Sequence, residues 1–189
     1  LKCDELKTST YSTVILEGTT GGVDGDIVFW GQGTINSGTY SGKDKTILAH
    51  GIEDTTINGG TFNSENIVIY SYFVTDVNIY GGTFTGKKVI YADYGGRAFV
   101  HDGQFTQVGD EGALFCANAD GYICAYAGIF DAATDISVSS DSGCRLSGGT
   151  FIGGITTKIS NLNECLGYNR QYWIGDIPQT VTDDQKEIS

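Results

Sequence analysis

Several residue types are scarce or missing in this chain, and each scarcity excludes a class of protein. Of 189 residues none is Met and only one is Pro. The absence of Met, even at position 1, indicates a processed product or an excised domain. No apolar stretch approaches the roughly 20 residues that a transmembrane helix needs, so we predict no transmembrane segment. Helix-forming residues are sparse, whereas Thr, Tyr, Ile and Phe favour strands, which argues against a helical bundle.

Positive charge is scarce as well. The chain has 11 Lys and Arg against 23 Asp and Glu, a formal net charge of −12 at pH 7. Nucleic acids and anionic membranes select basic surfaces, so we expect no nucleic acid partner, and long polyanionic substrates are disfavoured. Five cysteines in an acidic, strand-rich chain suggest an oxidising compartment. We therefore expect an extracellular or cell-surface protein.

Glycine, by contrast, is abundant, and many of the 28 glycines recur at a fixed spacing. An aromatic residue follows each repeated glycine by two positions, at intervals of 22, 22, 21, 25 and 21 residues: Tyr40, Phe62, Phe84, Phe105, Phe130 and Phe151. Three residues before that glycine comes an apolar column: Ile35, Ile57, Ile79, Val100, Ala125 and Leu146. Thirteen residues before it comes another: Ile47, Ile69, Ile90, Phe115 and Ile136. Almost all variation in repeat length falls after the aromatic residue.

The repeat predicts a stack of short strands. Apolar and polar residues alternate within each segment, which is the period of a β-strand. One repeat alone buries too few side chains to fold, but stacked repeats share hydrogen bonds and a continuous core. We therefore predict an all-β, right-handed parallel β-helix (β-solenoid) of about six to seven rungs of 21–25 residues. Residues 22–154 form the repeats, with caps at 1–21 and 155–189; the second cap contains a hairpin or irregular segment with Tyr172 and Trp173.

The repeat motifs also resemble a known group. Between Gly22 and Gly154 they read "SGTY", "GGTF", "GGTF", "DGQF", "AGIF" and "GGTF". The chain resembles the right-handed β-helix proteins with GGTF repeats, which are common in secreted and surface-attached bacterial proteins. We expect a non-catalytic structural or adhesive module, or a fibre subunit, without a cofactor. Its partners would be glycan or protein surfaces, or further copies joined end to end, because the ends of a β-helix are sheet edges.

An aromatic column on the outside of the predicted coil is the candidate binding site. Tyr80, His101 and Tyr126 each lie two residues before a repeated glycine, so they should stack at about 5 Å per rung. With Tyr70 and Tyr91 on the adjacent strand face, they would bind sugars by stacking. Plain strand packing is the simpler interpretation. The catalytic alternative is a polysaccharide lyase or hydrolase that uses His101, Tyr126 and Arg145 in the neighbouring column.

Two other outer surfaces suggest further functions, each with a simpler explanation. A threonine column at Thr39, Thr61, Thr83 and Thr150 is similar to those of ice-binding solenoids, but Gln104 and Ile129 interrupt it. Strand-favouring, solvated threonines are the preferred explanation. Four acidic residues could gather at one corner and offer oxygen ligands to Ca²⁺: Asp110, Glu111, Asp131 and Asp135. No known calcium-binding pattern accompanies them, so we predict no metal site.

The cysteines permit two disulfides. Cys144 and Cys165 lie 21 residues apart, one rung length, and Cys144 shares an inward column with Ile123. These two would stack and could form a disulfide, or remain as buried thiols. Cys116 and Cys124, both predicted to face outward in one rung, are the second pair, which leaves the role of Cys3 open. No C-x-x-C spacing or histidine cluster suggests that the cysteines bind a metal.

Overall fold

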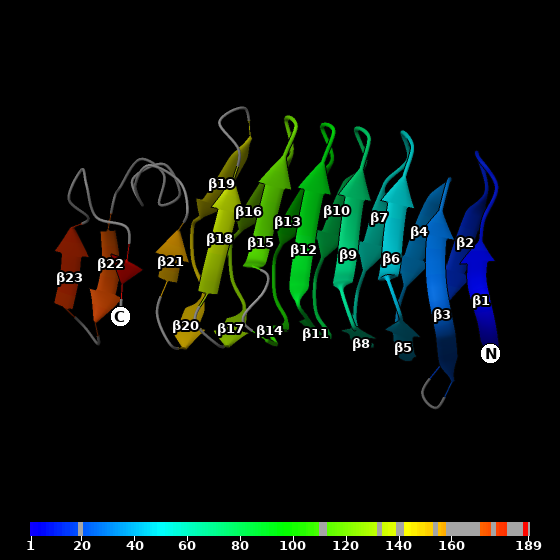
Figure 1. The fold of residues 1–189 in the computed structure, drawn as a ribbon, viewed down its shortest axis with the longest axis horizontal. Coiled ribbons are helices and arrows are strands. Elements are labelled where there is room, and N and C mark those ends of the chain that lie inside the picture. Colours follow the sequence, from blue (N-terminus) through cyan, green and yellow to red (C-terminus); the bar gives the residue numbers. More distant parts are fainter. Residues whose placement is uncertain are drawn as a thin grey trace.

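The computed structural model describes residues 1–18, 21–109, 113–131, 134–138, 142–152, 155–157, 171–174, 177–180 and 187–188. All regular elements in these ranges are strands, and the parallel strands stack into about six rungs. The predicted β-solenoid is therefore confirmed (Figure 1). Within the described ranges, no helix has the length and apolar character that crossing a membrane would require.

Each rung contributes three strands, which form three outer faces. The first face is the seven-stranded sheet, made of β2 (Thr13–Leu16), β4 (Gln32–Ile35), β7 (Thr55–Ile57), β10 (Asp76–Ile79), β13 (Arg97–Val100), β16 (Tyr122–Ala125) and β19 (Gly143–Leu146). The second face consists of β5 (Thr39–Gly42), β8 (Thr61–Ser64), β11 (Thr83–Gly86), β14 (Gln104–Gln107), β17 (Ile129–Asp131) and β20 (Thr150–Ile152). The third face consists of β6 (Lys45–His50), β9 (Ile67–Tyr72), β12 (Lys88–Asp93), β15 (Ala113–Asn118), β18 (Thr134–Val138) and β21 (Ile155–Thr157).

One long strand joins the second and third faces into a single 15-stranded sheet. The first residues of β3 (Gly22–Phe29) pair with β5, and its last residues pair with β6, so β3 passes around the corner between them. β1 (Lys2–Lys7) lies beside β3 in parallel. At the other end β24 (Glu187–Ile188) pairs with β21 in the antiparallel direction.

Figure 1 shows the direction of winding. The chain rises along the third face in front, crosses to the first face behind, descends there and passes through the second face at the bottom. It advances from right to left as it does so, which makes the coil right-handed, as predicted.

The predicted inward columns form the core. Ile35, Ile57, Ile79, Val100 and Ala125 are fully buried, as are Ile47, Ile69, Ile90 and Phe115. The aromatic column, called here the inner stack, is stacked face to face from rung to rung, and all its members are buried except the partly buried Phe151: Tyr40, Phe62, Phe84, Phe105, Phe130 and Phe151. The side chain of Ile136 in the same predicted columns lies outside the described part of the chain.

The repeated glycine has a backbone reason. Gly82 has a φ of +119°, which side chains other than glycine rarely adopt. A Cβ atom there would lie 3.0 Å from the carbonyl oxygen of Gly60, and that oxygen accepts a hydrogen bond from the Thr83 N–H. Glycine therefore lets the chain turn into the second face while the neighbouring rung stays close.

The predicted cap boundaries at 1–21, 22–154 and 155–189 remain predictions. β2, inside the first predicted cap, continues the first face because it pairs with β4 in parallel. β22 (Gln171–Ile174) and β23 (Ile177–Thr180) form an antiparallel pair in which Tyr172 lies opposite Gln179. The predicted hairpin with Tyr172 and Trp173 is thus present, and its position as a cover for the last rung remains a prediction.

The cysteine predictions need one correction. Cys116 and Cys124 were expected to face solvent and to form a disulfide, but both are buried and no disulfide joins two cysteines of the described residues. Cys116 lies on β15 in the 15-stranded sheet beside Tyr91, and Cys124 lies on β16 in the other sheet beside Phe99. Cys144 is buried opposite Ile123, as predicted. Its proposed partner Cys165 lies outside the described residues, so that pair remains a prediction.

Candidate functional site

The predicted aromatic column on the first face is present. Tyr80, His101 and Tyr126 follow directly after β10, β13 and β16, whose register places them side by side. The rings of Tyr80 and His101 are 4.5 Å apart with an angle of 9°, and those of His101 and Tyr126 are 5.2 Å apart with an angle of 20°. Tyr80 is 50% exposed and Tyr126 47%. These three residues are called here the outer ladder.

Stacking limits what the outer ladder can bind. Both faces of the His101 ring are covered, one by Tyr80 and the other by Tyr126, so only the edge of the ring faces solvent. The open ring faces are at the two ends, where Tyr126 is followed in its column by the small Ser147. A ligand can therefore stack at an end of the ladder and form hydrogen bonds with ring edges along its length.

The N-terminal half of the same column is polar. The Asn58 side-chain amide donates a 2.8 Å hydrogen bond to Asn36 Oδ1, and the Asn36 amide donates to Glu17 Oε1 at 2.6 Å. The column therefore changes from amides to aromatic rings between Asn58 and Tyr80. This change locates the candidate site in the C-terminal half of the first face.

Tyr70 and Tyr91 lie on a different face from the outer ladder. Their rings stack at 5.0 Å on β9 and β12 of the third face. The Tyr70 hydroxyl donates a 2.8 Å hydrogen bond to Asp93 Oδ2. Burial, followed by this hydrogen bond, raises the pKa of Tyr70 far above its usual range. The predicted five-residue site is thus divided between two surfaces.

The catalytic alternative gains little from the geometry. His101 stacks on Tyr126, and Arg145 lies on β19 beside Cys124. A hydrogen bond with Cys124 is the main cause that raises the pKa of the Tyr126 phenol, and the Arg145 charge opposes it only in part. A phenol with a raised pKa is less often ionised at neutral pH, which makes Tyr126 a poorer base for proton abstraction.

Of the other two predicted surfaces, the threonine column is fully described and the acidic group only in part. On the second face Thr39, Thr61 and Thr83 share one column, which then continues through Gln104 and Ile129 as the sequence indicates. Among the acidic residues, Asp131 is exposed at the end of β17, whereas Asp110, Glu111 and the side chain of Asp135 lie outside the described residues. The described ranges contain no group of three His, Cys, Asp or Glu residues suited to a metal ion.

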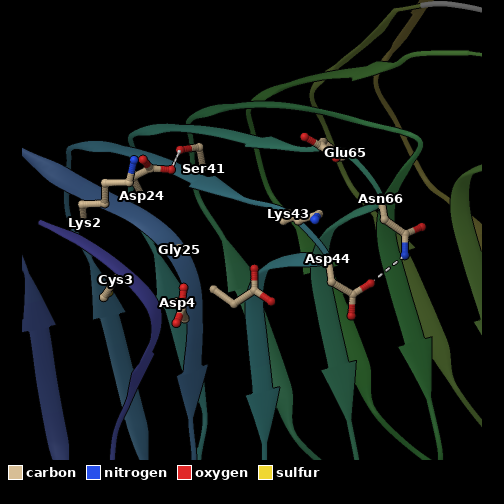
Figure 2. Close-up of a pocket in the computed structure, with 11 residues that line it drawn as sticks. Lys2, Cys3, Asp4, Asp24, Gly25, Ser41, Lys43, Asp44, Glu65 and Asn66 are labelled. Carbon is tan, nitrogen blue, oxygen red and sulfur yellow. Dashed lines mark hydrogen bonds between the residues drawn. The ribbon is translucent and has the colours of Figure 1, made fainter.

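A cavity of about 700 Å³ lies where β1 runs beside β3 (Figure 2). Its walls carry five carboxylates and two ammonium groups: Asp4, Asp24, Asp26, Asp44, Glu65, Lys2 and Lys43. Hydrogen bonds join Ser41 to Asp24 at 3.1 Å and Asn66 to Asp44 at 2.8 Å, as Figure 2 shows. Burial raises the pKa of Asp26. No residue of the predicted binding site lines this cavity.

Sequence reasoning missed an aromatic group at the corner between the third and first faces. Trp30, His50, Tyr72, Phe73 and Tyr94, called here the aromatic corner, lie in ring contact with one another. Trp30, His50 and Tyr72 share a column whose residue type changes at every rung, and Phe73 and Tyr94 lie in the turn that follows it, so the repeat does not reveal them. The only signal was the spacing of 22 residues that places His50 beside Tyr72.

Comparison with known proteins identifies no relative. The chain matches none of the protein family models, curated proteins or solved structures with which it was compared. The parallel β-solenoid is shown by the structure, and its finer assignment to the GGTF-repeat type is a proposal.

Proposed function

We propose that this chain is a non-catalytic module of an extracellular or cell-surface protein, of the bacterial GGTF-repeat type, that binds carbohydrate along its outer ladder. The observation that carries the proposal is the half-exposed stack of Tyr80, His101 and Tyr126. Aromatic side chains with a polar group combine apolar contact with hydrogen bonding, as sugar rings require.

The spacing of the outer ladder supports a chain-like ligand. Its rings are separated by 4.5 and 5.2 Å, because they follow neighbouring strands of one sheet. This step is close to the length of one sugar residue in an extended glycan. Stacking also holds the rings in one orientation before a ligand arrives, which lowers the entropic cost of binding.

The alternative role as a fibre subunit has less support at the N-terminal end. β1 borders the 15-stranded sheet there and carries four charged residues: Lys2, Asp4, Glu5 and Lys7. Charged edge strands hinder pairing with another chain. A contact through β1 would therefore need a partner strand of complementary charge and not an apolar edge strand.

The test is glycan binding by the whole chain. We expect the wild type to bind immobilised neutral polysaccharides, and Tyr80→Ala and Tyr126→Ala each to weaken binding at least about tenfold, the size of a hot-spot contact. Asn63→Ala is the matched control, because Asn63 is exposed on the second face. Unchanged binding in both tyrosine variants would reject the outer ladder as the site.

The same samples test the enzymatic alternative. Incubation with the bound polysaccharide should release neither reducing ends nor unsaturated sugars over a day. Product formation that disappears in His101→Ala would replace the binding proposal with a lyase or hydrolase.

A further inference from the structure

The third face has an aromatic surface of its own, and its centre is the aromatic corner. Trp30 follows β3, His50 ends β6 and Tyr72 ends β9, so these side chains lie at one edge of the face. In Figure 1 this edge is at the upper end of the front strands. Tyr72 is the hub, with ring contacts to His50 at 5.1 Å and Tyr94 at 5.3 Å.

Three of the ring pairs in the aromatic corner are tilted or edge-on, whereas His50 and Phe73 stack at 6.0 Å with an angle of 14°. The angle is 44° between Trp30 and His50, 31° between His50 and Tyr72, and 65° between Tyr72 and Tyr94. In the outer ladder the angles are 9° and 20°. Tilted rings do not cover one another completely, so parts of their faces remain open to a ligand, and ring faces are what the C–H side of a sugar contacts.

The turn at this corner has left-handed backbone conformations and carries exposed apolar side chains. Phe73 and Val74, which link β9 to β10, have φ angles of 61° and 60°, and Tyr94 one rung later has 50°. These angles are unfavourable for bulky residues, and most of all for the β-branched Val74. Yet Phe73 is 50% exposed, Val74 56% and Tyr94 58%. The same turn has positive φ at Ala119 and Asp120 one rung later, so this conformation belongs to the coil, and the exposed apolar side chains are what mark the aromatic corner as a contact surface.

Polar groups accompany the rings. Within the described residues Trp30 Nε1 and His50 Nδ1 are buried atoms without a hydrogen-bond partner. The column of His50 and Tyr72 continues to Asp93 and then to the exposed Asn118. Asp93 is buried and already accepts hydrogen bonds from the Tyr70 hydroxyl and the Tyr94 N–H, so the exposed Asn118 amide is the group of this column that suits the hydroxyl groups of a sugar.

From this arrangement we propose that the aromatic corner is a second carbohydrate site, which holds a neutral glycan chain running across the rungs from Trp30 toward Asn118. The proposal rests on the proposed function in its choice of ligand class, and it places that ligand on another face. A neutral glycan fits because the chain carries a net charge of −12 and the column itself contains Asp93. Sugars contact Tyr94, Phe73 and Tyr72 with their C–H faces and hydrogen bond to the Asn118 amide.

The experiment uses the full chain and a panel of neutral hexasaccharides from glucan, mannan, xylan and galactan, measured by calorimetric titration. We expect Tyr94→Ala and Phe73→Ser each to weaken binding of the hexasaccharide that binds best at least tenfold. Tyr94→Phe keeps the ring and should stay within threefold of the wild type. Circular dichroism of each variant shows whether it folds. Because Tyr94 and Phe73 are both exposed, the two substitutions test the site independently of each other.

The outcomes separate this proposal from the proposed function. Loss of binding in Tyr94→Ala with retention in Tyr80→Ala and Tyr126→Ala supports the aromatic corner and rejects the outer ladder. The reverse pattern keeps the outer ladder and overturns the second site. If no hexasaccharide binds the wild type, both are overturned. A change in the sedimentation coefficient of Tyr94→Ala would also overturn the second site, because the aromatic corner would then be a contact between copies of the chain.

Discussion

The inner stack and the outer ladder have the same geometry and different surroundings. Ring centroids in the inner stack are 4.7–5.2 Å apart, and those in the outer ladder 4.5–5.2 Å. The angles between neighbouring rings also overlap, at 4–23° inside and 9–20° outside. The distance between strands in a sheet imposes this stacking wherever aromatic residues share a column. Stacking by itself therefore says nothing about function.

Burial and continuity distinguish the two sets. Phe62, Phe84, Phe105 and Phe130 are fully buried, and the inner stack continues through all six repeats. The outer ladder has half-exposed rings in three rungs and gives way to amides at Asn58. A buried continuous stack contributes to the free energy of unfolding, whereas an exposed short one contributes little and remains available for contact with a partner.

The largest expected effect comes from removing a ring of the inner stack. Phe84→Ala should lower the free energy of unfolding by about 3–5 kcal/mol, because it deletes a fully buried ring and leaves a cavity between Phe62 and Phe105. Urea unfolding followed by circular dichroism measures it. Phe84→Leu, which refills much of the volume, should cost clearly less. Equal losses in Phe84→Ala and Tyr80→Ala would remove the distinction between inner and outer rings.

A smaller effect is expected at the glycine that leads into the inner stack. Gly82→Ala should cost about 1–3 kcal/mol, because its φ of +119° is strained for alanine and the new Cβ would lie 3.1 Å from the Phe84 ring. Gly81→Ala is the matched control, since Gly81 has no positive φ. Urea unfolding of both variants makes the comparison, and equal losses would show that the glycine conformation is not what the repeat requires.

The repeat made the fold and the outer ladder predictable. A fixed spacing between Ile57 and Ile79 sets the register of their strands, and that register brings Tyr80 next to His101 without further information. Alternation then decides which side chains point inward. Ile67 marks the limit of this reasoning: it is buried, whereas its lateral neighbours Lys45 and Lys88 in the same column are only half-buried.

What the sequence did not reveal depends on residues that break the columns. Cys116 and Cys124 occupy positions that alternation predicts to face outward, yet both are buried beside the large residues Tyr91 and Phe99. The aromatic corner depends on turns in left-handed conformations at Phe73 and Tyr94, which have no sequence signature in residues of this type. The cavity in Figure 2 arises because β1 runs beside β3, and nothing in the repeat predicts that pairing.

For the outer ladder we expect a modest effect on stability. Tyr80→Ala should lower the free energy of unfolding by about 0.5–1.5 kcal/mol, the usual range for an aromatic pair, because its stacking on His101 is lost while half of its surface was already exposed. Its effect on glycan binding should be larger than its effect on stability. The same urea titration measures it, and a cost above that of Gly82→Ala would mean that the ladder serves mainly to hold the rungs together.

The smallest effect is expected where the outer column changes to amides. Asn58→Ala removes one exposed hydrogen bond, from the Asn58 amide to Asn36 Oδ1 at 2.8 Å, and should cost about 0.5 kcal/mol. It also removes the polar neighbour on the N-terminal side of the Tyr80 ring. Because the three rings of the outer ladder stay in place, glycan binding should change less than twofold. Asn63→Ala, on the second face, should leave both quantities unchanged. A loss in Asn58→Ala as large as in Tyr80→Ala would show that amides and rings of this column contribute alike, and that the aromatic half has no special role.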